Sequence, residues 1–146
     1  FRPVEEDDPT EHQIHTEYYQ IDEQAAEALN QANAEKRRII AVGTTSVRVL
    51  EQAALDLEQR GQTELSATEG EAILFILPGH PFRLVNAMVT NFHLPRSSLL
   101  MLVSAFVEHG QGPSTGSGRA EVLAAYMAAT ERGYRFYSFG DAMLIA

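Results

Sequence analysis

The chain contains no cysteine and no tryptophan among its 146 residues. The absence of cysteine excludes disulfides, zinc thiolates and a thiol nucleophile. Long hydrophobic runs are also missing, because the longest one, residues 97–107, would rise only about 16 Å as a helix, against roughly 30 Å for a bilayer core. We therefore expect this run to form a buried helix, and we expect no membrane partner.

A signal peptide is also lacking at the start of the sequence. Phe1-Arg2-Pro3-Val4 leads directly into Glu5-Glu6-Asp7-Asp8, with no apolar segment between them. This pattern is typical of a cytoplasmic protein. Because the sequence does not begin with methionine, we also expect a fragment or a trimmed chain.

The net charge of −9 is unevenly distributed along the chain. Residues 1–35 hold ten of the twenty acidic side chains and one basic side chain, whereas residues 36–146 hold ten of each. The acidic segment alone would argue against a nucleic-acid partner. The neutral remainder can still form a local positive patch, for which the candidates are Arg83, Arg96, Arg132 and Arg135.

Alternating strand and helix signals predict a single α/β domain over residues 1–146. The apolar run Ile39–Val42 is typical of a strand buried on both faces, and a turn over 43–46 leads into a helix that ends at Gly61. The other expected elements are a helix over 23–30 capped by Asp22 or a neighbour, strands over 72–77 and 82–89 around a turn at 78–81, a helix beginning at Ser97 or Ser98, a flexible loop over 109–118, a helix over 120–132 and a strand over 134–139.

The turn Gly43-Thr44-Thr45-Ser46 is a candidate anion site. It offers main-chain N–H groups at a helix N-terminus and three hydroxyls, and Arg48 follows two residues into the helix. The alternative is an ordinary helix cap, since the turn has neither the lysine of a P-loop nor the Gly-x-Gly-x-x-Gly pattern. A carboxylate or phosphate ligand is therefore a hypothesis at this point.

Histidines mark two further candidate sites. His12, His15 and Glu17 could perform acid/base chemistry in a polar pocket, and the alternative is a solvated acidic surface. The spacing of these residues argues against a metal site. His93 lies between Asn91 and Pro95 on an expected strand-to-helix loop, where α/β proteins commonly place functional groups. A loop histidine bonded to the backbone is the alternative.

The aromatic segment Tyr134-Arg135-Phe136-Tyr137-Ser138-Phe139 allows two interpretations. Its rings could stack on nucleobases around Arg135. Alternation along a half-buried strand explains the same pattern as core packing, and we favour that interpretation here.

Several longer motifs occur in one order along the chain. They are His12-x-x-His15-x-Glu17-Tyr18, the segment 41–51 around Gly43-Thr44-Thr45-Ser46, Pro78-Gly79, Thr90-Asn91-Phe92-His93-Leu94-Pro95 with its continuation to Leu99, the segment 101–105, and the segment from Gly133 to Gly140-Asp141-Ala142-Met143-Leu144-Ile145. Together they closely resemble the C-terminal part of the S-adenosylmethionine:tRNA ribosyltransferase-isomerases of queuosine biosynthesis.

The resemblance implies a fold and a reaction. The fold is a layered α/β/α main domain, of which this chain would be the C-terminal part, with a small inserted β-barrel and the first part of the domain upstream of Phe1. The reaction transfers the ribosyl group of S-adenosylmethionine onto 7-aminomethyl-7-deazaguanine at the tRNA wobble position. It gives epoxyqueuosine, releases adenine and methionine, and uses no metal.

The resemblance also suggests which residues carry this reaction. An acid assists release of adenine, and a base removes a proton from the carbon next to the sulfonium. We assign acid/base and orienting roles to His93, His12, His15, Glu17 and Asp141. We assign substrate binding to Gly43, Thr44, Thr45, Ser46, Arg48, Asn91, Arg96 and Arg135.

Some positions depart from the family pattern. Glu71, Leu77 and His80 stand where the family usually has aromatic residues, and the connection over 108–118 is longer than usual, either by divergence or by an engineered replacement. A non-catalytic α/β module that binds anions or RNA is therefore the alternative function. A methyltransferase that uses the same substrate is disfavoured, because the 43–46 turn lacks a glycine-rich first loop.

Overall fold

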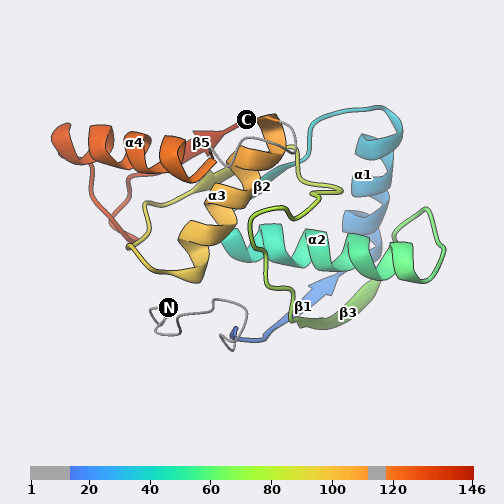
Figure 1. Ribbon diagram of the computed structural model, residues 1–146. Helices are drawn as coiled ribbons and strands as arrows, with labels where there is room; N and C mark the ends of the chain where they lie inside the picture. Colours follow the sequence, from blue (N-terminus) through green and yellow to red (C-terminus); the bar gives the residue numbers. More distant parts are fainter. Residues whose placement is uncertain (1–13, 112–117) are drawn as a thin grey trace.

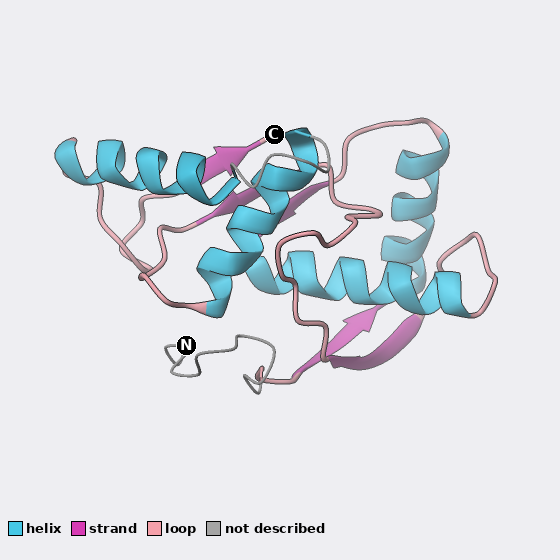
Figure 2. Cartoon of the chain, in the orientation of Figure 1, coloured by secondary structure: helices cyan, strands magenta, loops and turns pink. Residues whose placement is uncertain are grey.

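The computed structural model describes residues 14–111 and 118–146, which form a mixed α/β fold with two small sheets (Figures 1 and 2). The predicted α/β class is confirmed. The elements are β1 (Glu17–Ile21), α1 (Glu23–Ala34), β2 (Ile40–Val42), α2 (Thr44–Gln59), β3 (Thr68–Ala72), β4 (Ala87–Thr90), α3 (Ser98–Gln111), α4 (Gly118–Glu131) and β5 (Met143–Ile145). No helix in these two ranges is long and apolar enough to cross a bilayer.

The larger sheet has the strand order β2-β4-β5 and carries the main core. β2 runs parallel to β4, and β5 runs antiparallel to it. The paired residues Ala41 and Met88 face a core that also contains Val47 of α2 and Leu102 of α3, and α4 adds Tyr126. Three helices therefore pack on one face of this sheet, and Figure 2 shows α3 crossing it.

Part of the opposite face of the larger sheet is uncovered among the described residues, although Ala87 on that face is buried. Val42, Val89 and Leu144 lie side by side on it, and the side chains of Val42 and Leu144 are 69% and 65% exposed. The prediction that residues 39–42 are buried on both faces is therefore wrong for β2. The physical reason is that α2, α3 and α4 all pack against the Ala41 side.

The smaller sheet pairs β1 with β3 in antiparallel register. Tyr19 and Ile21 pack with Ala26 of α1 and Ala53 of α2 in a second core cluster. The predicted cap of α1 is confirmed, because the Asp22 side chain accepts a hydrogen bond from the Ala25 N–H at 2.8 Å.

Both strands predicted around the Pro78-Gly79 turn are wrong over most of their length, although the turn itself is present. Residues 73–77 and 82–86 are irregular, and only the ends of the predicted strands pair in sheets. Four of their backbone polar groups bond instead to two buried, charged side chains of α2. Arg48 donates to the carbonyl oxygens of Ala72 at 2.8 Å and Leu74 at 3.1 Å.

Glu51 is the second of these buried side chains and is fully shielded from solvent. Its carboxylate accepts hydrogen bonds from the main-chain N–H groups of Arg83, Leu84 and Val85 at 2.8–3.0 Å. Burial alone raises the pKa of Glu51, but the His80 ring 3.6 Å away and these three N–H groups outweigh it and hold the pKa below its usual value. An ionised carboxylate thus takes the place of a strand partner for residues 83–85.

The strand predicted over 134–139 is also wrong, because this segment is a loop and the third strand of the sheet is β5. Phe136 packs against the main core, and the half-exposed Tyr134 ring contacts Phe92 at the edge of that core, whereas Tyr137 and Phe139 are exposed. The aromatic residues of this segment therefore do not alternate along a half-buried strand, contrary to the prediction from the sequence.

The helices α3 and α4 cross closely at Gly118. Gly118 begins α4 and residues 109–111 end α3, so the predicted loop over 109–118 is helical at both of its ends. The rest of that loop, residues 112–117, lies outside the described residues. A Cβ added at Gly118 would lie 2.5 Å from the Ser104 carbonyl oxygen and 2.8 Å from the Glu108 nitrogen.

We expect Gly118→Ala to destabilise the protein by about 1–3 kcal/mol, because two helix backbones must move apart to admit the methyl group. Gly110→Ala is the matched control. A Cβ at Gly110 of α3 meets nothing within 4 Å, so this change is expected to be neutral or to stabilise by up to about 1 kcal/mol. Urea unfolding of both variants measures the difference, and equal stabilities would contradict the close crossing.

Candidate functional site

A pocket of about 300 Å³ lies where the parallel strands β2 and β4 end and the helices α2 and α3 begin. Open α/β sheets commonly place ligands outside the carboxyl ends of such strands. The loop that follows α4 closes the third side. The lining residues are Gly43, Thr44, Thr45, Thr90, Asn91, Phe92, His93, Leu94, Pro95, Ser97, Leu99, Tyr137 and Ser138.

The N-terminus of α2 forms one wall of the pocket. Gly43 has a φ of 91°, which favours glycine, and its N–H donates to the Val89 carbonyl at 2.8 Å. Among the described residues, no side chain caps this helix. The N–H groups of the first turn have no partner within the helix, and the helix dipole makes this end attractive to anions.

The hydroxyls of this turn are not equivalent. Thr44 and Thr45 line the pocket, whereas the Ser46 hydroxyl donates to the Val42 carbonyl at 2.9 Å. The anion site predicted over Gly43–Ser46 therefore presents its first three residues to the pocket. Ser46 completes the turn from the strand side.

His93 lies on the opposite wall with both ring nitrogens near hydroxyl groups. Its Nε2 is 3.4 Å from Thr90 Oγ1, and its Nδ1 is 3.4 Å from the Tyr126 hydroxyl. Burial lowers the pKa of His93 to about 4. At neutral pH the imidazole is therefore uncharged, and it can donate or accept a hydrogen bond or take up a proton.

The C-terminal loop is attached to this wall through Tyr137. The Asn91 side-chain amide donates to the Tyr137 carbonyl at 2.6 Å, and the Tyr137 N–H donates to the Phe92 carbonyl at 3.0 Å. Tyr137 has a φ of 60°, an uncommon backbone conformation for a residue other than glycine. Two hydrogen bonds thus hold a strained residue at the edge of the pocket, as is common at functional sites.

Arg48 is not among the pocket-lining residues, although it was predicted to bind substrate. Its side chain is buried and donates to the carbonyl oxygens of Ala72, Leu74 and His15, and it lies 3.5 Å from a Glu17 carboxylate oxygen. This network assigns Arg48 a structural role, and we do not include it in the binding site.

The predicted group of His12, His15 and Glu17 is only partly described. His12 lies outside the described residues. The His15 side chain is exposed and its carbonyl binds Arg48, while Glu17 belongs to β1. Neither residue lines the pocket, although Arg48 ties both to the first half of α2.

Arg135 and Asp141 bind each other instead of facing the pocket. Arg135 Nε lies 2.8 Å from Asp141 Oδ2, and the same oxygen accepts the Arg135 N–H at 2.7 Å. The hydrogen bonds from Arg135 lower the pKa of Asp141 below its usual value. Arg96 is exposed with a φ of 58°, and it also does not line the pocket.

The structure thus brings together five of the predicted site residues: Gly43, Thr44, Thr45, Asn91 and His93. Sequence reasoning missed Thr90, Leu94, Ser97 and Leu99 as lining residues, although they lie in the same motif as His93. Tyr137 and Ser138 join the pocket through a chain reversal that no local pattern indicates. Within 14–111 and 118–146, no group of three or more His, Asp or Glu side chains could hold a metal ion.

Comparisons with known proteins identify a family and several relatives that match this chain. A family described as "Queuosine biosynthesis protein" matches residues 1–145. An S-adenosylmethionine:tRNA ribosyltransferase-isomerase from Heliobacterium modesticaldum is 50% identical over 145 residues, which are 99% of this chain and 38% of the relative. A protein of the same name from Thermus thermophilus is 52% identical over 145 residues, 99% of this chain and 37% of the relative.

A solved structure shows the same partial coverage. The S-adenosylmethionine tRNA ribosyltransferase from Thermotoga maritima is 45% identical and superposes with a TM-score of 0.72, covering 88% of this chain and 40% of that chain. The chain therefore spans somewhat less than two fifths of the length of these curated relatives. This coverage agrees with the predicted match to a C-terminal portion.

Proposed function

This chain belongs to the queuosine biosynthesis protein family, and on that premise we propose that it supplies the S-adenosylmethionine pocket of a tRNA ribosyltransferase-isomerase. The complete enzyme would transfer and isomerise the ribosyl group onto 7-aminomethyl-7-deazaguanine at the tRNA wobble position. The products would be epoxyqueuosine, adenine and methionine. The observation that carries the proposal is the pocket between the α2 N-terminus and His93.

The two walls suit different parts of the co-substrate. The N–H groups in the first turn of α2 have no partner within the helix and favour an anion, so we assign the methionyl carboxylate to the Gly43–Thr45 turn, where the N–H groups of Thr44 and Thr45 are its donors. The neutral His93 ring then faces the reacting part of the molecule. Its lowered pKa keeps the ring unprotonated at neutral pH and makes it a weaker base than a free imidazole, so the proposed base role rests on the position of His93 in the pocket.

Two of the four candidate arginines are free to bind tRNA phosphates. Arg83 pairs with Glu58 at 2.7 Å, and Arg135 pairs with Asp141. Arg96 and Arg132 have no acidic partner among the described residues and are both exposed. We assign phosphate contacts to these two, with tRNA affinity that falls as salt concentration rises. We place this activity in the cytoplasm.

The exposed apolar residues on the larger sheet support the idea that the active enzyme is a longer protein that covers them. Val42, Val89 and Leu144 give additional chain an apolar surface to pack against, and the relatives are more than twice as long as this chain. The appropriate test protein is a chimera in which this chain replaces the matching segment of the Thermus thermophilus relative.

Adenine release tests the proposal. The chimera is incubated with S-adenosylmethionine and tRNA that carries 7-aminomethyl-7-deazaguanine, and adenine is quantified by mass spectrometry. We expect release that depends on the modified tRNA base. In the contrary outcome, the chimera binds tRNA without releasing adenine while the intact relative releases it in the same assay. That result would contradict the transferase proposal for this chain and favour the non-catalytic binding module.

A further inference from the structure

Tyr126 is a buried tyrosine of α4 whose hydroxyl touches the candidate catalytic residue twice. The hydroxyl oxygen accepts the His93 main-chain N–H at 3.0 Å and lies 3.4 Å from His93 Nδ1. Tyr126 is 33 residues away in sequence and was not among the predicted site residues. It also does not line the pocket, so any effect on the reaction passes through His93.

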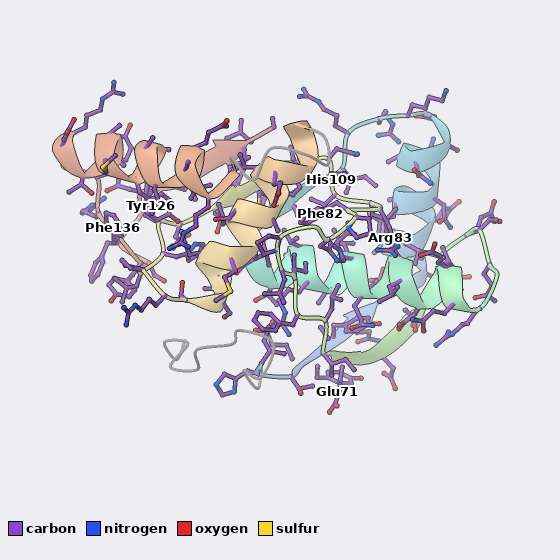
Figure 3. The ribbon with its side chains drawn as sticks, viewed as in Figure 1. Glu71, Phe82, Arg83, His109, Tyr126 and Phe136 are labelled. Carbon is purple, nitrogen blue, oxygen red and sulfur yellow. The ribbon has the colours of Figure 1, made fainter. Side chains whose placement is uncertain are left out.

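The Tyr126 ring is held in place by aromatic contacts. It packs edge-on against Phe92, with centroids 5.3 Å apart, and edge-on against Phe136 at 5.8 Å. Figure 3 shows Tyr126 and Phe136 close together, on α4 and on the loop that follows it. The orientation of the hydroxyl is therefore set by the core, not by the pocket.

The contacts of the Tyr126 hydroxyl are met by an arrangement of protons that involves both ring nitrogens of His93. A tyrosine hydroxyl has one proton to donate and two lone pairs that accept. The His93 main-chain N–H occupies one lone pair, which leaves the hydroxyl proton available for Nδ1 of the His93 ring, 3.4 Å away. The neutral ring then carries its own proton on Nε2, where Thr90 Oγ1 lies 3.4 Å away and can accept it.

We propose that Tyr126 is a positioning residue that fixes His93 as the tautomer protonated on Nε2. This inference deepens the proposed function, because a fixed tautomer determines which ring nitrogen can take a proton from the substrate. The 3.4 Å separations at both nitrogens are long for hydrogen bonds, and such contacts commonly tighten when substrate binds.

The test compares two variants, each of which loses one tyrosine hydroxyl. Tyr126→Phe removes the group near His93. Tyr134→Phe is the matched control, because the Tyr134 ring also packs against Phe92, at 5.7 Å, and no hydrogen bond of its hydroxyl is found among the described residues. Long-range ¹H–¹⁵N spectra of the 146-residue chain at pH 7 distinguish protonated from bare ring nitrogens, and His93→Gln identifies the His93 signals.

We expect His93 to be protonated on Nε2 in the wild type and in Tyr134→Phe, and to become a mixture of tautomers in Tyr126→Phe. A wild-type spectrum with the proton on Nδ1 overturns the proposal without any variant, so the test survives a variant that fails to fold. An unchanged spectrum in Tyr126→Phe also overturns it.

Activity gives a second, separate readout in the chimera. We expect Tyr126→Phe to lower kcat for adenine release by about 10- to 100-fold with KM for S-adenosylmethionine little changed, as for other residues that orient a functional histidine. Tyr134→Phe is expected to retain kcat. A chimera without activity counts against the proposed function, whereas the tautomer measurement on His93 decides the role of Tyr126 independently.

Discussion

Glu51→Ala is expected to destabilise the protein by about 3–5 kcal/mol, enough to unfold a marginal domain. The change leaves the N–H groups of Arg83, Leu84 and Val85 without an acceptor in a region shielded from solvent. Glu51→Gln keeps one acceptor oxygen and is expected to cost less, about 1–3 kcal/mol. Chemical denaturation followed by circular dichroism measures both values.

The control for this prediction is Glu58→Ala on the same helix. Glu58 also contacts the 81–85 segment, through Arg83, but its side chain is largely exposed and such pairs contribute only about 0–1 kcal/mol. Similar losses for Glu51→Ala and Glu58→Ala would contradict the assignment of Glu51 as the anchor of this segment.

The same carboxylate makes stability depend on pH. The pKa of Glu51 is lower in the folded state than in the unfolded state. Its contribution is therefore complete above the unfolded value of about 4.3 and is lost as pH falls through the folded value. The difference in unfolding free energy between wild type and Glu51→Gln should accordingly shrink on acidification below this range.

His93→Ala is the second prediction with a large expected effect. We expect it to lower kcat/KM for adenine release by the chimera by about 10²- to 10⁴-fold, the usual contribution of a general acid or base. His109→Ala is the control, because His109 lies on the exposed end of α3 and its ring contacts Phe82. Unfolding of each variant is measured in parallel to separate lost chemistry from lost structure.

Two outcomes would count against His93. Wild-type adenine release by His93→Ala would remove it from the catalytic group. Loss of activity in His109→Ala to the same extent would show that the assay responds to any histidine change in α3 or the preceding loop. The low pKa of His93 adds a further expectation, that its protonation does not limit the rate between pH 6 and 8.

Local signals in the sequence predicted the elements that local interactions build. The Asp22 cap is one example, and the Ser97 hydroxyl at the start of α3 is another, since it accepts the Leu100 N–H at 3.2 Å. The unit of β2, the Gly43 turn and α2 was also predicted. Each of these features depends on residues that are close together in the sequence.

The failed predictions involve distant partners. Residues 73–77 and 82–86 have the composition of strands, but Arg48 binds the Leu74 carbonyl and Glu51 binds the N–H groups of residues 83–85, each from a helix more than 20 residues away. The pattern of an apolar run does not show that buried charges will replace strand pairing. Likewise, the exposure of Val42 follows from which face of the sheet the helices cover.

The candidate site was predicted where it is continuous in sequence. His93 and Asn91 lie in one of the most specific motifs, Gly43–Thr45 lie in a weaker one, and all of them line the pocket. Arg48 was assigned to the site because of its position near a helix N-terminus, but its side chain binds the carbonyl groups of Leu74 and His15, which do not line the pocket. Tyr126 and Tyr137 join through tertiary contacts that spacing does not encode.

The location of the co-substrate is the central claim, and amide chemical-shift mapping tests it most directly. S-adenosylmethionine is added to the ¹⁵N-labelled chimera that releases adenine, and shifts are recorded for its amides. We predict the largest changes at Thr44, Thr45, Asn91 and His93, with little change at Glu27 and Gln31 beside the groove between α1 and residues 64–67. The assignment of the pocket would be contradicted if other amides shifted to saturation as S-adenosylmethionine is added while these four amides did not shift.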